Sequence, residues 1–178
     1  MPYGVLSPSQ KQQLKHFVQG QRVVDLGAGD LKLANDLLRL GTTQVLAIDK
    51  EGMRTRSHRI ALFNGRFDQV PDSFPLDLAF VAWPPNWKCG LERLVRLSKT
   101  VVYLGKNTDG TMCGTAELFQ DLSRRNVLAY VPDPKNTLIV YGSEQVVRPP
   151  KGEELAGLRI STDLYSFAQA EAAVQESA

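Results

Sequence analysis

Between residues 21 and 104 the sequence alternates short apolar runs with polar segments of helical period, and this alternation limits the fold more than any other feature. Runs that are apolar on both faces are typical of strands buried in a parallel sheet. Strands of this kind that alternate with helices form a doubly wound α/β sheet. We predict five parallel strands, over residues 22–26, 45–48, 60–63, 76–83 and 100–104.

Helices are predicted before and between these strands. Ser7 and Gln10 have the spacing of a capping box, with a proline at the first helical position between them. Asp30 is expected to cap a second helix, which Gly41 ends. The expected helices cover residues 8–19, 31–40, 87–97, 115–125 and, as a shorter polar and basic segment, 51–59.

The last part of the predicted sheet is an antiparallel hairpin. Two strand-like runs, 127–131 and 137–141, flank a five-residue turn with two prolines, an aspartate and an asparagine. The fold prediction is therefore a doubly wound, mostly parallel seven-stranded sheet with a C-terminal antiparallel hairpin that reverses one edge strand. The predicted organisation is an N-terminal helix packed on the core (1–20), the core (21–142) and a C-terminal tail of open structure (143–178).

Composition sets limits on the class of protein. A chain of 178 residues with 43% hydrophobic residues can bury one core. The formal charge of +2 does not by itself indicate a nucleic-acid partner. Cys89 and Cys113 have neither the spacing of a zinc site nor that of a disulfide framework, so no metal is expected. Because no run resembles a signal peptide or a membrane span, we expect a cytoplasmic protein without membrane contact.

The segment Asp25-Leu26-Gly27-Ala28-Gly29-Asp30 follows the first strand and carries the functional argument. Its glycines allow a ligand to approach the backbone, but the third glycine of a pyrophosphate-binding loop is missing, since Leu31 and Lys32 follow. Asp25 and Asp30 would repel a pyrophosphate and attract the sulfonium and ammonium groups of S-adenosylmethionine. The pattern therefore favours S-adenosylmethionine over a dinucleotide.

The same segment resembles the D/E-x-G-x-G motif of the class I S-adenosylmethionine-dependent methyltransferases. This resemblance extends over residues 21–87 and implies the fold described above, together with methyl transfer from S-adenosylmethionine. It implies that Asp49, at the end of the second strand, binds the ribose hydroxyls, and that Asp68 lies against the adenine amino group. The cofactor-binding residues expected from the resemblance are Asp25, Gly27, Ala28, Gly29, Asp49, Lys50 and Asp68.

The acceptor side of the site is expected after the fourth strand. Trp83-Pro84-Pro85-Asn86-Trp87 partly resembles the Asp/Asn-Pro-Pro-aromatic motif of enzymes that methylate amino or amide nitrogens, with the polar and aromatic positions inverted. We hypothesise that Trp83 or Trp87 forms a wall for the acceptor, while the Asn86 amide or the Pro84 carbonyl orients the nucleophile. The resemblance therefore makes a nitrogen nucleophile a candidate acceptor, and Asn86, Trp83 and Trp87 the candidate catalytic residues.

Several alternatives stay open at this point. The acceptor can be a small molecule, a nucleic acid or a protein, and the oligomeric state is not determined. The chain could also be a module that binds S-adenosylmethionine without turnover. A third possibility is a nucleic-acid-binding domain that uses the basic cluster Lys50, Arg54, Arg56, Arg59 and Arg66, although such a cluster is more often a solvated surface.

Overall fold

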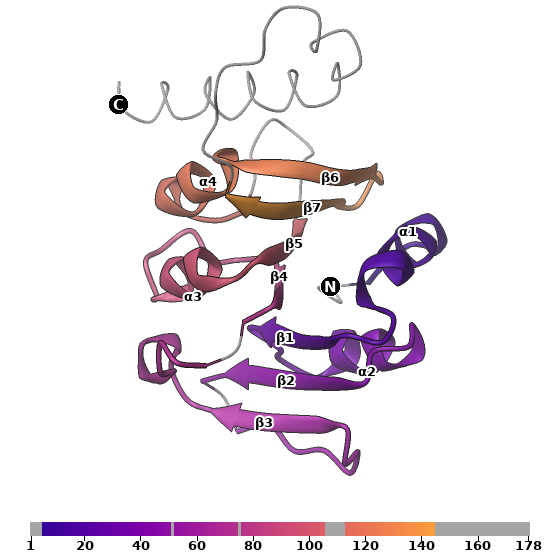
Figure 1. Cartoon of the computed structure of the whole chain (residues 1–178). Coiled ribbons are helices and arrows are strands. Elements are labelled where there is room, and N and C mark those ends of the chain that lie inside the picture. Colours follow the sequence, from indigo (N-terminus) through magenta and orange to yellow (C-terminus); the bar gives the residue numbers. More distant parts are fainter. Residues whose placement is uncertain (1–4, 51, 75, 106–112, 145–178) are drawn as a thin grey trace, which may run out of the picture.

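The computed structural model describes residues 5–50, 52–74, 76–105 and 113–144, and these form a seven-stranded sheet with helices on both faces (Figure 1). The strand order is β3-β2-β1-β4-β5-β7-β6. The predicted tail lies almost entirely outside the described residues. The strands are β1 (Arg22–Leu26), β2 (Gln44–Asp49), β3 (Ile60–Asn64), β4 (Leu78–Ala82), β5 (Thr100–Gly105), β6 (Arg125–Pro132) and β7 (Thr137–Glu144).

The first five strands are parallel, and β7 pairs antiparallel with both β5 and β6. This confirms the predicted sheet and its C-terminal hairpin. The position of the reversed strand differs from the prediction, because β7 lies between β5 and β6 and the edge strand is β6. After β5 the chain forms β6 one strand position away, and β7 then fills the position between them. The backbone N–H and C=O groups of β5 and β6 that face this position thus gain hydrogen-bond partners.

The helices are α1 (Pro8–Val18), α2 (Lys32–Arg39), α3 (Leu91–Leu97) and α4 (Ala116–Ser123), and a 3-10 helix, η1 (Phe67–Gln69), follows β3. The predicted short helix at 51–59 is wrong, since its described part, 52–59, contains no helix. The helix predicted from residue 87 begins only at Leu91, because Gly90 adopts φ +87° and turns the chain there. The capping box at Ser7 and Gln10 is present as predicted.

Asp30 does not occupy the N-cap position of α2, which was its predicted place. Leu31 is the N-cap residue, with φ +63°, and it has no side-chain cap. The Asp30 carboxylate instead accepts a hydrogen bond from the backbone N–H of Lys32 and pairs with the Lys32 ammonium at 2.6 Å. The acid therefore stabilises the turn that precedes the helix.

Two apolar layers hold the sheet between its helices. On one face, Leu14 and Val18 of α1 and Leu37 of α2 are fully buried in the layer that contains Val23 and Phe80. The other face is covered by α3 and α4, whose buried leucines belong to a second cluster with β1, β4 and β5. Successive residues of one strand thus belong to different layers, as expected when both faces of a parallel sheet are covered.

A buried amide links α1 to the hairpin turn. Gln10 is fully buried, and its side-chain NH₂ donates to Asn136 Oδ1 at 2.8 Å. The Asn136 amide donates in turn to the Val5 carbonyl. The first helix is therefore fixed to the far end of the sheet by hydrogen bonds as well as by apolar packing. No helix in the described ranges has the length and apolar character that a bilayer span requires.

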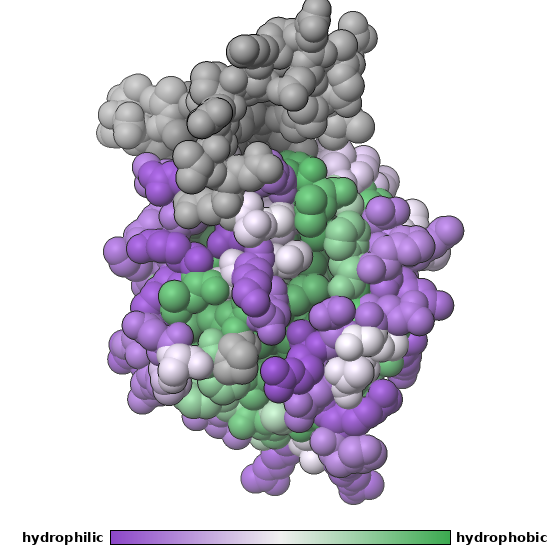
Figure 2. Space-filling model, viewed as in Figure 1, coloured by the Kyte–Doolittle hydropathy of each residue, from purple (hydrophilic) through white to green (hydrophobic). Residues whose placement is uncertain are grey.

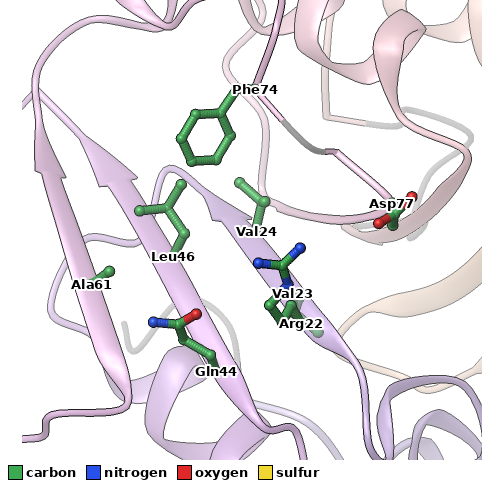
Figure 3. A pocket seen from close by; sticks show the side chains of 8 residues that line it. All are labelled: Arg22, Val23, Val24, Gln44, Leu46, Ala61, Phe74 and Asp77. Atoms are coloured by element: carbon green, nitrogen blue, oxygen red, sulfur yellow. The ribbon is translucent and has the colours of Figure 1, made fainter.

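A shallow groove of about 240 Å³ lies over the first half of β1 and β2 (Figure 3). Its lining includes the apolar side chains of Val24, Leu46 and Phe74, together with the charged residues Arg22 and Asp77. The described residues between β3 and β4 contain η1 and no longer helix that would cover this part of the sheet. The groove lies at the strand starts, so it is separate from the carboxyl edge at which the candidate residues follow their strands.

Candidate functional site

The glycine turn after β1 is fixed to the end of β2. The amides of Gly27 and Ala28 both donate to the Ile48 carbonyl, at 2.8 and 3.1 Å. Gly27 has φ +84° and Gly29 has φ +50°, a region that side-chain-bearing residues rarely adopt. A Cβ atom at Gly29 would meet nothing within 4 Å. The turn therefore presents open backbone at the carboxyl edge of the sheet, which lies at the left of β1, β2 and β3 in Figure 1.

Asp49 lies directly beside this turn. Its Oδ2 accepts a hydrogen bond from the Gly29 amide at 2.9 Å, and its own backbone carbonyl accepts from the Gly65 amide at 2.8 Å. The carboxylate is thus oriented by the glycine turn on one side, while the backbone is held by the loop after β3 on the other. The last residue of β2 is thereby fixed between the two flanking loops. Lys50, the next residue, is exposed.

Asp25 is a carboxyl group in an unfavourable environment. The residue is fully buried, and neither carboxylate oxygen forms a hydrogen bond within the described part of the chain. Burial, together with the negative charge of Asp49, raises the pKa of Asp25 from 3.8 to about 7. Buried polar groups normally have partners, and strongly perturbed titratable groups are concentrated at functional sites. Asp25 is therefore suited to a cationic ligand, which would stabilise its ionised form.

Asp68 lies at the next strand end, in η1. Its carboxylate is about half exposed and pairs with the Arg66 guanidinium, whose Nε donates to Oδ1 at 3.1 Å. Two contacts connect η1 to neighbouring loops. A Cβ atom at Gly27 would lie 4.0 Å from the Phe67 ring, and one at Gly90 would lie 3.2 Å from the Asp68 backbone nitrogen. The glycine turn, η1 and the loop before α3 therefore pack against one another at one edge.

Trp83, directly after β4, has a strained backbone. Its φ is +50°, an uncommon value for a bulky side chain, and such outliers store about 1–3 kcal/mol where the surroundings enforce them. The Trp83 amide donates to the Leu104 carbonyl at 2.7 Å, and Pro84 is buried. The geometry at the end of β4 is thus enforced by β5, and it directs the chain across the carboxyl edge.

Asn86 and Trp87 lie further along this loop and differ in their surroundings. Asn86 Oδ1 accepts a hydrogen bond from the Gly114 amide at 2.8 Å, so this oxygen already connects two loops. The Trp87 side chain is 67% exposed. The NH₂ group of Asn86 has no hydrogen bond to a described residue, and the ring of Trp87 is largely exposed. Of the two, Trp87 has the surroundings of a contact surface and Asn86 those of a loop anchor.

The structure brings most of the candidate residues to one edge. The glycine turn, the carboxyl end of β2, η1 and the loop before α3 are connected by contacts through Ile48, Asp49, Phe67 and Gly90. Phe67 and Gly90 are not among the site residues predicted from the sequence. An aromatic residue beside Asp68 and a glycine directly before a helix were the available signals. Among the described residues, no cluster of histidine, cysteine, aspartate and glutamate is arranged to hold a metal ion.

Comparison with known proteins identifies the fold. No protein-family model and no curated protein sequence matches the chain. A solved structure, that of 1,6-didemethyltoxoflavin-N1-methyltransferase from Burkholderia thailandensis with bound S-adenosylhomocysteine, is 13% identical with a TM-score of 0.57, covering 74% of this chain and 75% of that one. The fold is that of the class I methyltransferases. The N-methyltransferase NodS from Bradyrhizobium japonicum, 12% identical, also has a TM-score of 0.57 and covers 77% of this chain and 94% of that one.

The methyltransferase fold explains why the candidate residues lie at one edge. Open α/β sheets bind their ligands beyond the carboxyl ends of the strands, next to the point where the strand order reverses. Here that point lies between β1 and β4, since the chain runs outward to β3 from one side of β1 and to β5 from the other. Asp25 lies near the carboxyl end of β1 and the glycine turn follows that strand, while Trp83 follows β4.

Proposed function

We propose that the protein binds S-adenosylmethionine at the carboxyl edge of β1 and β2 and transfers its methyl group to an acceptor placed beyond β4. The observation that carries this proposal is the buried Asp25 carboxyl, which has no hydrogen-bond partner in the described part of the chain and a pKa of about 7. A ligand with positive charge next to this group would offset the cost of ionising it. S-adenosylmethionine carries two such charges, on its sulfonium and its ammonium group.

The rest of the edge supports the same ligand. The open backbone at Gly29 admits a ligand close to the turn, and the amide of that residue is already paired with Asp49. The turn lacks the third glycine of a pyrophosphate-binding loop, because Leu31 and Lys32 follow Asp30, and this argues against a dinucleotide. In this proposal Asp25 faces the methionine part, Asp49 the ribose and Asp68 the adenine. Ala28 and Lys50 border the ligand through their positions next to the turn and to Asp49.

The chemistry requires little from the protein beyond positioning. Bound S-adenosylmethionine would supply a methyl group on sulfur: the acceptor lone pair would form the new bond to carbon, the C–S electron pair would stay on sulfur as a neutral thioether, and the acceptor would release a proton to water. Trp83, held by β5, and the exposed Trp87 would flank the acceptor. The Asn86 NH₂ group would donate a hydrogen bond to a neighbouring polar atom of the acceptor and so orient the acceptor in the site.

Calorimetric titration tests the proposal. S-adenosylmethionine, S-adenosylhomocysteine and NAD are titrated into the wild-type protein and into two variants. Asp49→Ala removes the carboxylate that pairs with the Gly29 amide, whereas the control Asp77→Ala removes an exposed aspartate next to the groove at the strand starts. We expect the first two ligands to bind the wild type and the control and to lose affinity for Asp49→Ala. Tighter binding of NAD, or no binding of either sulfur compound, contradicts the proposal.

A further inference from the structure

A row of cations borders the exposed edge of β3. Lys50, Arg54, Arg56 and Arg59 all lie in the connection between β2 and β3, and all four are exposed. None of them has an ion pair with another residue in the described ranges. Most of the other lysines and arginines in the described part of the chain do have an ion pair, each with a carboxylate within 3.2 Å: Lys11, Lys32, Arg39, Arg66, Lys88, Arg93, Arg96 and Lys99.

The sequence does not compensate this charge locally. Between Asp49 and Asp68 it contains five lysines and arginines but one acid, Glu51. Because the whole chain has a formal charge of only +2, the excess is a local feature of the β3 edge. A cluster of this kind raises the local concentration of anionic partners, while a dispersed charge of the same size does not.

The shape of the row argues for an extended anion. The connection leaves the carboxyl end of β2 at Asp49 and reaches the amino end of β3 at Ile60, so it spans the length of a five-residue strand, about 16 Å. In Figure 1 it passes along the lower edge of the sheet beside β3, and Figure 2 shows hydrophilic side chains projecting from that edge. Charges spread over this length match several phosphates of a chain better than they match one small anion.

The row ends at the proposed methyl-transfer site. Lys50 follows Asp49, whose carbonyl binds the Gly65 amide, and the loop after Gly65 leads to Asp68 and its contact with Gly90. Trp87, 67% exposed, lies three residues before Gly90 in the sequence. Single-stranded nucleic acids are bound by grooves or rows of cations combined with aromatic rings on which bases stack. Both components are present along this edge.

We propose that the acceptor is a single nucleic-acid strand whose phosphates lie along Lys50, Arg54, Arg56 and Arg59 while one base reaches the carboxyl edge near Trp87. This inference rests on the proposed methyl transfer. Arginine, three of the four cations, matches phosphate geometry with two parallel donors. An anionic membrane fits less well, because the exposed large apolar residues of the described chain are Val5, Trp87, Leu97 and Leu128, and none lies in the connection.

Binding to a polyanion is measured first, without S-adenosylmethionine. The probe is a labelled pool of unmodified single-stranded RNA of random sequence, about 40 nucleotides long, with the corresponding DNA pool as a second arm. The variant Arg54→Gln/Arg56→Gln/Arg59→Gln is compared with the matched control Lys15→Gln/Arg124→Gln/Lys135→Gln, which removes three exposed cations elsewhere. Each phosphate contact contributes about 0.7 to the slope of log K against log salt. The magnitude of this slope should therefore be smaller by about 2 for the arginine variant than for the wild type, and nearly unchanged for the control.

Transfer is measured next, as incorporation of a labelled methyl group from S-adenosylmethionine into the same pools. We expect incorporation into RNA or DNA by the wild type and the control, and at least a tenfold loss in the arginine variant at physiological salt. Calorimetry should show unchanged affinity of that variant for S-adenosylmethionine. Three results would overturn the inference. The two triple variants could have equal salt slopes, the wild type could incorporate no methyl group into either pool, or the protein could bind phosphatidylserine vesicles and neither nucleic-acid pool. If S-adenosylmethionine itself does not bind the wild type, the proposed function fails, and the salt slopes still report on the row of cations.

Discussion

Replacing Asp25 by asparagine should stabilise the free protein at pH 8 and change its stability little at pH 4. The pKa of this carboxyl is about 7 in the folded state, against an ordinary value of 3.8, because it is fully buried and close to the charge of Asp49. The folded state therefore binds the proton more tightly than the unfolded state does. The stability of the wild type falls as the pH rises from about 4 to about 7, and it is constant above that range.

The size of the effect follows from the pKa values. One unit of pKa corresponds to about 1.36 kcal/mol, so a pKa of about 7 instead of 3.8 makes the ionised Asp25 cost about 4 kcal/mol. Asparagine has nearly the same volume and stays neutral, so the variant avoids this cost at pH 8. At pH 4 both proteins bury a neutral group of similar shape, and the difference between their free energies of unfolding should be small.

Urea unfolding of the wild type and of Asp25→Asn at intervals between pH 4 and pH 8 measures this difference. Asp77→Asn is the control, because the pKa of Asp77 is lowered by its hydrogen bond and ion pair with Lys99. The control should lose a little stability at neutral pH and none at low pH, the opposite direction to Asp25→Asn. If the stability of Asp25→Asn followed that of the wild type in parallel over the whole range, Asp25 would not carry a raised pKa and the argument for a cationic ligand would lose its basis.

Two further substitutions separate the ligand site from the scaffold. Gly29→Ala should lower the free energy of unfolding by only about 1–2 kcal/mol, because φ is +50° but the added Cβ would meet no atom within 4 Å. In the proposed site this methyl group lies on the ligand side of the turn, so calorimetry should show weaker binding of S-adenosylmethionine. Unchanged affinity would mean that the ligand binds elsewhere. Gln10→Leu should lower the free energy of unfolding, measured in urea, by about 1–3 kcal/mol, because the buried Asn136 side chain loses its hydrogen-bond partner at 2.8 Å. The affinity for S-adenosylmethionine should not change. An unchanged free energy of unfolding would show that the link between α1 and the hairpin is dispensable.

The sheet could be predicted from the sequence because its signal is local. Val23 and Val24 are both buried, in different layers, so the run is apolar at consecutive positions and its limits coincide with those of β1. The glycine turn was equally readable, since few other residues adopt the φ values of Gly27 and Gly29. Both features depend on neighbours in the sequence alone.

The errors arose where distant parts of the chain decide the structure. The place of β7 depends on which neighbour completes the hydrogen bonds of β5, and the hairpin sequence is compatible with either order. Segment 52–59 remains without a helix because Met53 is its only apolar residue and its amide is already bound by Asn64 Oδ1, 11 residues away. The contacts of Asp68 with Gly90 and of Asn86 with Gly114 join separate loops, and no periodicity reveals them.

The buried Asp25 connects stability, protonation and ligand binding in one group. A carboxyl with a pKa of about 7 is largely neutral below that pH, so a cationic ligand must displace a proton to form its ion pair. Affinity for S-adenosylmethionine should then decrease by up to about tenfold for each pH unit below 7, with release of close to one proton per ligand bound, while Asp25→Asn should bind weakly at every pH. A residue that only supports the fold would lower stability and affinity together when it is replaced. For Asp25 the two quantities should change in opposite directions at pH 8, because the charge that destabilises the free protein is the charge that the ligand requires.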